Sequence, residues 1–294
     1  MKNSKAFFSV LLSGMLWGII TIFIKNLSRL DVDAMQISLI RMVVAAPLFT
    51  LFLAVKDKSK LKIKLKDLWI FLGTGIVSVV LFNCAYFYTM IKSEASIAVV
   101  LLYTSPVFIM ILSAILFKEK ITVRKLVALA LTFAGCVLVA GLIGGKYQLK
   151  PLILLTGLAS GLFYGLYTIF GRVALKKYDT LTVTVYTFIF GLVGSLFIGK
   201  PMETISEIKL SPEIILWGLG IGFFCTVLPY FFYTWGLQRM ESGKAAIIVA
   251  IEPMVGAVLG MAVYGESVSA FKITGILLIL TAIIILNLPE KSKV

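Results

Sequence analysis

The chain has 294 residues, of which 60% are hydrophobic and 14% are charged, and its formal net charge is +14. With a mean hydropathy of +1.04, this composition excludes an ordinary soluble globular protein and leaves a soluble bundle of ten buried helices as a poor alternative. The sequence contains no histidine, which excludes imidazole metal sites, His-based catalytic triads and imidazole proton relays.

Ten apolar segments of about 17–25 residues, long enough to cross a bilayer core, follow one another along the chain. They cover residues 7–26, 36–55, 68–91, 95–117, 123–142, 152–171, 180–199, 212–236, 243–264 and 271–288. The first segment is too long for a signal peptide and lacks a small-residue cleavage pattern, so we interpret it as an uncleaved span. The sequence therefore predicts an all-α integral membrane protein with ten transmembrane helices.

The five-span unit is written twice. Ser13–Phe23 and Ser160–Phe170 share a serine, two glycines and the ending Thr-Ile-Phe, at an offset of 147 residues. The same offset, without a gap, aligns Tyr86 with Tyr233, Pro106 with Pro253, Glu119 with Glu266 and Lys125 with Lys272. A fixed period of this kind indicates an internal repeat, and it predicts two units, residues 1–147 and 148–294.

The charges indicate that the two units have opposite orientation in the membrane. Because five spans is an odd number, the second unit enters from the other side. The join at 56–66 is rich in lysine, whereas its counterpart at 201–212 contains more glutamate than lysine. By the positive-inside rule both termini face the cytoplasm, and the basic joins meet lipid headgroups rather than nucleic acid. Inverted repeats are typical of secondary transporters; a duplicated scaffold without a pathway is the alternative.

Spans 1 and 6 carry glycines at helical spacing, which packing alone explains. Trp17 and Tyr164 lie near the middle of these spans, with Thr21 and Tyr167 beside them. An aromatic ring with a polar atom at that depth needs a hydrogen-bond partner or a cavity. We therefore expect both rings to line a cavity.

Span 2 contains Arg41, whose expected role is structural, by reaching the outer headgroups or by a pairing that fixes the helix, with substrate contact as the alternative. Spans 3 and 8 present Asn83 and Tyr86, and Tyr230 and Tyr233. This is more polar surface than contact with lipid requires, so these side chains are candidates for substrate binding.

Spans 4 and 9 contain mid-span prolines, Pro106 and Pro253, preceded by Tyr103 and Glu252. A proline frees a carbonyl one turn back, and such a break is tolerated where it faces protein or water. A carboxylate at mid-depth costs about 2.5 kcal/mol or more unless it is paired, hydrated or protonated. Glu252 therefore marks either a functional site or a protonated strut that fixes the break.

Spans 4 and 9 are each followed by a glutamate, Glu119 and Glu266. We expect them to cap the helices that follow, with closure of a gate as the alternative. Spans 5 and 10 are almost entirely aliphatic, and this favours a peripheral position or a contact in a homodimer.

At these residues the chain resembles the EamA family of the drug/metabolite transporter superfamily. The strongest matches are Ser105-Pro-Val-Phe108, Phe117-Lys-Glu-Lys-Ile-Thr122, Ile251-Glu-Pro-Met254 and Tyr264-Gly-Glu-Ser267. The resemblance implies two inverted five-helix repeats, cytoplasmic termini and a central cavity built by spans 1, 3, 4, 6, 8 and 9. It also implies export of amino acids or related metabolites, or movement of drugs or nucleotide-sugar-like solutes. Lys118 departs from the glycine common in the family.

The resulting hypothesis is a secondary transporter, without a cofactor or metal, that moves a small metabolite by alternating access in a bacterial plasma membrane. The substrate-binding candidates are Trp17, Thr21, Asn83, Tyr86, Tyr103, Tyr164, Tyr167, Tyr230, Tyr233 and Glu252. Pro106, Pro253, Glu119 and Glu266 are candidates for helix breaks and gating. An amino acid is the favoured substrate, and Glu252 would bind its amine or carry a coupling proton. An organic-cation or drug transporter, a channel and an intramembrane enzyme are the alternatives.

Overall fold

The computed structural model describes residues 2–93, 95–143, 150–198 and 211–288. Within these ranges the chain is helical and no strand occurs. The predicted outward join at 201–212 lies largely outside the described residues, and so do Glu94 and residues 289–294.

The first repeat consists of five spans, three of them built from more than one helical piece. Its elements are α1 (Lys2–Gly18), α2 (Ile20–Arg29), α3 (Ala34–Asp57), η1 (Lys58–Leu61), η2 (Leu65–Asp67), α4 (Leu68–Leu72), the π-helix η3 (Gly73–Leu81), α5 (Phe82–Lys92), α6 (Ala95–Leu102), α7 (Ser105–Phe117) and α8 (Val123–Val139).

The second repeat follows the same plan. Its elements are α9 (Pro151–Ala174), α10 (Thr180–Ile198), α12 (Pro212–Gly222), the π-helix η4 (Phe223–Val227), α13 (Leu228–Leu237), α14 (Ser242–Val249), α15 (Glu252–Tyr264) and α16 (Ala270–Asn287). Nine helical stretches within the described ranges are apolar and at least 18 residues long, and α8 adds a tenth apolar helix of 17 residues. The prediction of a ten-helix membrane fold is confirmed.

The fourth and ninth spans are interrupted in the same way. In both, a short helix ends and a new one begins with a proline in its first turn, at Pro106 in α7 and Pro253 in α15. The bounds of α6 and α7 match those of α14 and α15 at the 147-residue offset. Proline has no N–H to donate and its ring clashes with the preceding turn, so the helix restarts there. The restart places polar backbone groups at mid-depth, beside the interior of the bundle.

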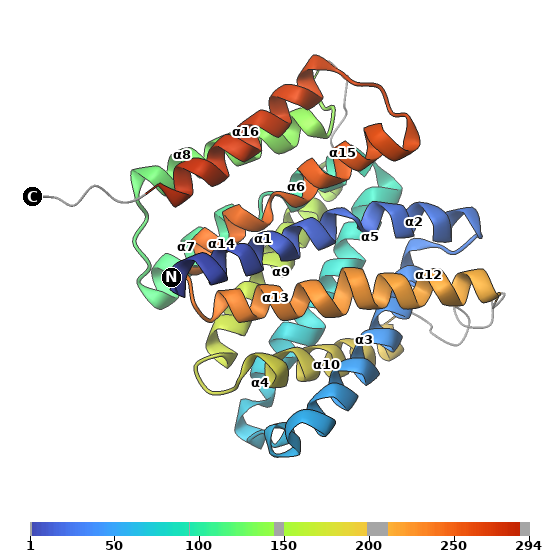
Figure 1. The fold of residues 1–294 in the computed structure, drawn as a ribbon, viewed down its shortest axis with the longest axis vertical. Coiled ribbons are helices and arrows are strands. Elements are labelled where there is room, and N and C mark those ends of the chain that lie inside the picture. Colours follow the sequence, from blue (N-terminus) through green and yellow to red (C-terminus); the bar gives the residue numbers. More distant parts are fainter. Residues whose placement is uncertain (1, 94, 144–149, 199–210, 289–294) are drawn as a thin grey trace, which may run out of the picture.

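The α8 and α16 helices lie side by side along one edge of the molecule (Figure 1). Their backbones approach closely at Gly135 and Gly275, where neither residue has a Cβ. A Cβ added to Gly135 would lie only 2.8 Å from the Gly275 carbonyl oxygen, and one added to Gly275 only 2.7 Å from the Gly135 carbonyl oxygen. Small residues of this kind let membrane helices pack through dispersion contacts. The two aliphatic spans thus join the two repeats to each other.

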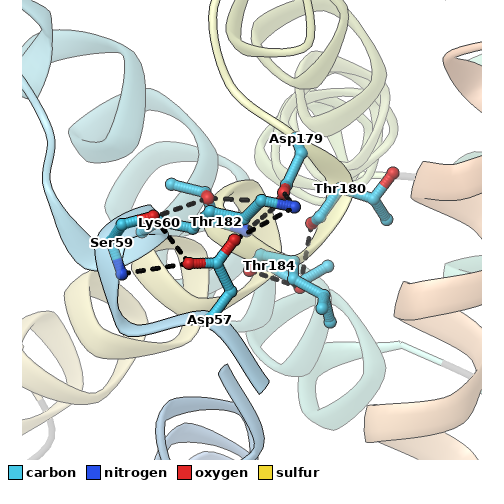
Figure 2. A network of polar contacts seen from close by, with 8 residues as sticks. Asp57, Ser59, Lys60, Asp179, Thr180, Thr182 and Thr184 are labelled. Atoms are coloured by element: carbon cyan, nitrogen blue, oxygen red, sulfur yellow. Dashed lines mark hydrogen bonds and ion pairs between the residues drawn. The ribbon is translucent and has the colours of Figure 1, made fainter. Parts of the chain in front are cut away.

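The α1 helix begins and the α16 helix ends on the same side of the molecule (Figure 1). We call that side the termini face, and the side where α2 ends and α12 begins the far face. At the termini face the end of α3 is tied to the start of α10, as Figure 2 shows. Lys60 Nζ lies 2.6 Å from Asp179 Oδ2, and the Thr182 hydroxyl donates to the Lys60 carbonyl oxygen over 3.0 Å. The two repeats are therefore bonded together at this face.

The helices that follow spans 4 and 9 are not capped by the glutamates, contrary to the favoured expectation. Thr122 caps α8 by accepting from the Lys125 N–H over 3.3 Å. Ser269 caps α16 by accepting from the Lys272 N–H over 3.2 Å. A hydroxyl directly before the first helical residue reaches this N–H with less strain than a carboxylate three residues upstream, so Glu119 and Glu266 are left to bond elsewhere.

Candidate functional site

A cavity of about 200 Å³ lies between the two repeats. Six of the predicted binding residues line it, namely Trp17, Asn83, Tyr86, Tyr164, Tyr230 and Glu252, and Arg41 lines it as well. The remaining lining residues are Ile20, Ile24, Ala34, Ile37, Ser38, Phe82, Phe87, Met90 and Leu102. Several of these stand in the first half of α2, near the end of α5 and at the start of α3, so the cavity extends from mid-depth toward the far face.

One cation and one anion face this cavity. Arg41 Nε donates to the Thr226 hydroxyl over 2.9 Å, and neither Nη group has a partner among the described residues. Glu252 is the first residue of α15 and lines the same cavity. No ion pair within 4 Å joins Arg41 to Glu252 in the part of the chain that the structure describes. Charges at this depth are costly unless compensated, and the arrangement leaves both able to bind an oppositely charged group.

The π-helix of span 8 positions the partner of Arg41. Thr226 belongs to η4, and its hydroxyl donates to the Ile221 carbonyl oxygen over 3.1 Å, five residues back. A π-helical turn widens the backbone and leaves carbonyls available to side chains, and such turns are frequent at functional sites. The local widening therefore holds the hydroxyl that fixes the guanidinium.

Aromatic rings form the base of the cavity. Trp17 meets Tyr230 edge-on, with ring centroids 5.2 Å apart and an interplanar angle of 84°. Phe82 lies 5.7 Å from Tyr86 and 5.4 Å from Tyr164. Edge-to-face, stacked and tilted pairs at these distances are favourable and restrict the rings, so the apolar surface of the cavity is preformed. Asn83 adds a polar contact, because its amide donates to the Ser38 hydroxyl over 2.6 Å.

The other predicted binding residues lie elsewhere. Tyr103, Tyr233, Pro106 and again Tyr164 surround a second cavity of only about 10 Å³. Tyr167 is buried, and its hydroxyl shares a hydrogen bond of 2.6 Å with Thr234. Thr21 donates to the Gly18 carbonyl oxygen over 3.4 Å within its own span. Neither Tyr167 nor Thr21 lines the larger cavity.

Sequence reasoning missed several residues that line the cavity or contact its lining side chains. Ser38 stands one helical turn before Arg41 on α3, and that spacing could have placed it on the same face. Thr226 could not be found in this way, because it is 185 residues away from Arg41 and their contact depends on how α3 crosses span 8. The aliphatic lining residues are chemically identical to the lipid-facing ones, so the sequence contains no signal for them.

Several cavity-lining residues of the first repeat have counterparts, 147 residues later, that are packed in the protein interior. Counterparts of Arg41, Ser38, Met90 and Ala34 are Phe188, Val185, Leu237 and Leu181, and all four are buried in one hydrophobic cluster. We call the side toward the far face, which holds the cavity, the open half, and the side toward the termini face, where these four counterparts are buried, the closed half.

A model of the EamA-like transporter family matches residues 4–141 and again residues 151–288. The chain belongs to the EamA-like transporter family. This EamA protein is a multi-pass membrane transporter, which implies a small-molecule substrate and contact with the bilayer.

Relatives support the assignment. This EamA protein is 26% identical over 294 residues to an uncharacterized transporter of Archaeoglobus fulgidus, with 94% of each chain covered. It is 25% identical over 299 residues to the uncharacterized inner membrane transporter YicL of Salmonella typhimurium, covering 99% of this chain and 98% of the relative. A crystal structure with 14% sequence identity superposes with a TM-score of 0.82 over 97% of both chains, which shows that the fold is shared.

Proposed function

We propose that this transporter exports a small zwitterionic metabolite, an amino acid with an apolar or aromatic side chain, by alternating access. The observation that carries the proposal is the presence of Arg41 and Glu252 in one cavity without an ion pair between them. Export is the direction that the resemblance to metabolite exporters favours.

The geometry of the two charges fits the backbone end of an amino acid. A guanidinium offers a planar fork of donors that matches a carboxylate, and the Nη groups of Arg41 would supply it. Glu252 would accept from the ammonium group, while Trp17, Tyr86 and Tyr230 would cover the side chain through ring contacts. In this proposal Arg41 changes from the expected structural charge to a binding residue that Thr226 orients.

An organic cation remains the second candidate because the rings surround a carboxylate, and cation–π contacts contribute about 0.5–2 kcal/mol each. Arg41 argues against it, since a guanidinium at the same cavity repels a substrate without a carboxylate. The two candidates differ in what Arg41 does: it would assist binding of a zwitterion and oppose binding of a quaternary amine.

Alternating access is supported by the inverted repeats, because exchange of the conformations of the two repeats would open the closed half and close the open one. The lysine-rich termini face supports cytoplasmic termini and a plasma-membrane location. In this orientation the cavity opens outward. When the substrate leaves, a proton would neutralise Glu252 in place of the ammonium group, which would couple transport to a proton gradient.

The test is counterflow of labelled amino acids and of choline into proteoliposomes. We expect saturable counterflow of an apolar amino acid. Glu252→Gln and Arg41→Gln should reduce it at least about 30-fold, because removing one partner of a buried charge contact costs about 2 kcal/mol or more. The matched controls are Glu213→Gln and Arg239→Gln, which change exposed groups away from the cavity. Choline counterflow that rises in Arg41→Gln would instead establish the organic-cation function.

A further inference from the structure

The closed half is held by a hydrogen bond whose two residues recur in register in the open half. The Thr168 and Tyr233 hydroxyls lie 2.7 Å apart, buried between α9 and α13. At the 147-residue offset the first repeat has the same residue types, Thr21 and Tyr86. There Tyr86 lines the open cavity, and no hydrogen bond joins it to Thr21 among the described residues.

A second contact at the termini face crosses from one repeat to the other. The Glu119 carboxylate, just after α7, accepts from the backbone N–H of Ser242 over 2.8 Å and of Gly243 over 3.2 Å. These are the first residues of α14, where free N–H groups and the helix dipole favour an anion. Beside this contact Lys125, which is buried, lies 2.7 Å from Glu241. Glu119 thus fixes the broken span of the second repeat against the first.

Its register counterpart, Glu266, is built into the same local structure but has other partners. Glu119 N–H donates to the Ser113 carbonyl oxygen and Glu266 N–H to the Gly260 carbonyl oxygen, over 3.3 and 3.1 Å. The Glu266 carboxylate lies 3.0 Å from Lys25 and 3.1 Å from Lys272.

The counterpart of α14 is α6, which begins at Ala95. In this conformation α6 does not have Glu266 at its N-terminus, because that carboxylate is held by the two lysines.

We propose that these contacts form an exchanging latch. In the opposite conformation Glu266 leaves the lysines and accepts from the first N–H groups of α6, and Thr21 bonds to Tyr86. At the same time Glu119 leaves α14, and Thr168 separates from Tyr233. The inference rests on the proposed alternating access. It explains why the same residue types stand at both sets of positions although only one set is joined in this conformation, and it makes the two conformations similar in energy.

The experiment measures the conformations without substrate, using one reporter cysteine for each half. The reporters are Ala34→Cys, at the open cavity, and Ala246→Cys, at the small closed one, in a background without Cys84, Cys136 and Cys225. An impermeant maleimide is added to right-side-out and to inverted vesicles. The matched variants are Tyr86→Phe and Tyr233→Phe, each of which deletes one hydroxyl.

Tyr233→Phe should destabilise the conformation in which the termini half is closed, so labelling of Ala246→Cys should rise about fivefold and labelling of Ala34→Cys should fall. The loss of one net hydrogen bond shifts an equilibrium constant by about that factor. Tyr86→Phe should produce the opposite changes. Glu119→Gln and Glu266→Gln provide a second pair with the same opposed signs, and they retain the size of the side chain if the tyrosine variants fold poorly.

The latch would be refuted if the two variants of a pair changed the labelling of a reporter equally or in the same direction. Because no substrate is present, this outcome is separate from the transport assay. Opposed shifts in a protein that shows no counterflow would support the latch and refute the proposed substrate, whereas counterflow with same-sign shifts would support transport and refute the latch.

Discussion

The two halves of the molecule differ clearly in the side chains at positions that the 147-residue offset makes equivalent. In the open half Arg41, Ser38 and Asn83 present polar groups to the cavity. In the closed half the counterparts of Arg41 and Ser38 are Phe188 and Val185, which are buried in a hydrophobic cluster. The counterpart of Asn83 is Tyr230, which lines the open cavity together with it. The two repeats therefore share one backbone plan, but at these equivalent positions the first repeat presents polar side chains to the cavity and the second presents mostly apolar ones to the core.

The backbone of the first span also differs between the halves. In the first repeat it is divided at Ile19 into α1 and α2, whereas α9 runs unbroken from Pro151 to Ala174. The break follows Gly18, which packs so closely on α15 that a Cβ there would lie 2.8 Å from the Glu252 carbonyl oxygen. The division of the first span thus lies where it packs closely against the helix that presents Glu252.

The largest difference in stability between equivalent substitutions is expected at Gly18 and Gly165. A Cβ on Gly18 would lie 2.5 Å from Val255 Cβ, whereas one on Gly165 would lie 3.1 Å from Ile109 Cγ1. Gly18→Ala should therefore destabilise the protein by about 1–3 kcal/mol through overpacking, and Gly165→Ala, the matched control, by much less. Unfolding in detergent measures both, and equal losses would contradict the difference in packing between the halves.

A smaller effect is expected at the equivalent helix ends. Lys118 and Gly265 both adopt left-handed backbone, with φ of 58° and 64°. A side chain in that conformation costs about 1 kcal/mol, so Lys118→Gly should stabilise the protein by about that amount and Gly265→Lys should destabilise it similarly. Thermal unfolding of both variants checks this, and a loss of stability in Lys118→Gly would show that the lysine side chain contributes more than its strain.

The smallest effect concerns pH. Lys25 and, next, Lys272 hold the pKa of Glu266 below its usual value. A lowered pKa in the folded protein means that this carboxylate adds stability above the usual pKa, and that the gain is lost as pH falls through the lowered one. Because the side chains of Lys25 and Glu266 are about two-fifths exposed, we expect the gain in stability to be less than about 1 kcal/mol.

The measurement is the difference in stability between the native chain and Glu266→Gln, from neutral pH down to about pH 4. It should shrink as the pH falls. A difference that grows under acid would mean that the protonated form is the one stabilised by its neighbours.

The sequence predicted the features that each segment carries by itself. Apolar length predicted the spans, the 147-residue register predicted the two repeats, the odd number of spans predicted their inversion, and Pro106 and Pro253 marked where helices restart. Contacts between distant segments were less accessible: Thr226 beside Arg41 and the Glu119 contact with α14 depend on how spans cross. Glu119 illustrates the limit, because its position shortly before α8 suggested a cap on that helix, whereas its partners are 123 and 124 residues away. The roles of the cavity residues stay predictions.

The most direct measurement is labelling of the Ala34→Cys and Ala246→Cys reporters from each side of the membrane, in the background without Cys84, Cys136 and Cys225 and with no latch substitution. We predict that Ala34→Cys reacts from the outside and Ala246→Cys from the cytoplasmic side, and that conditions which raise one rate lower the other. Simultaneous reaction of both reporters from a single side would show a continuous pore and would contradict alternation between the two halves.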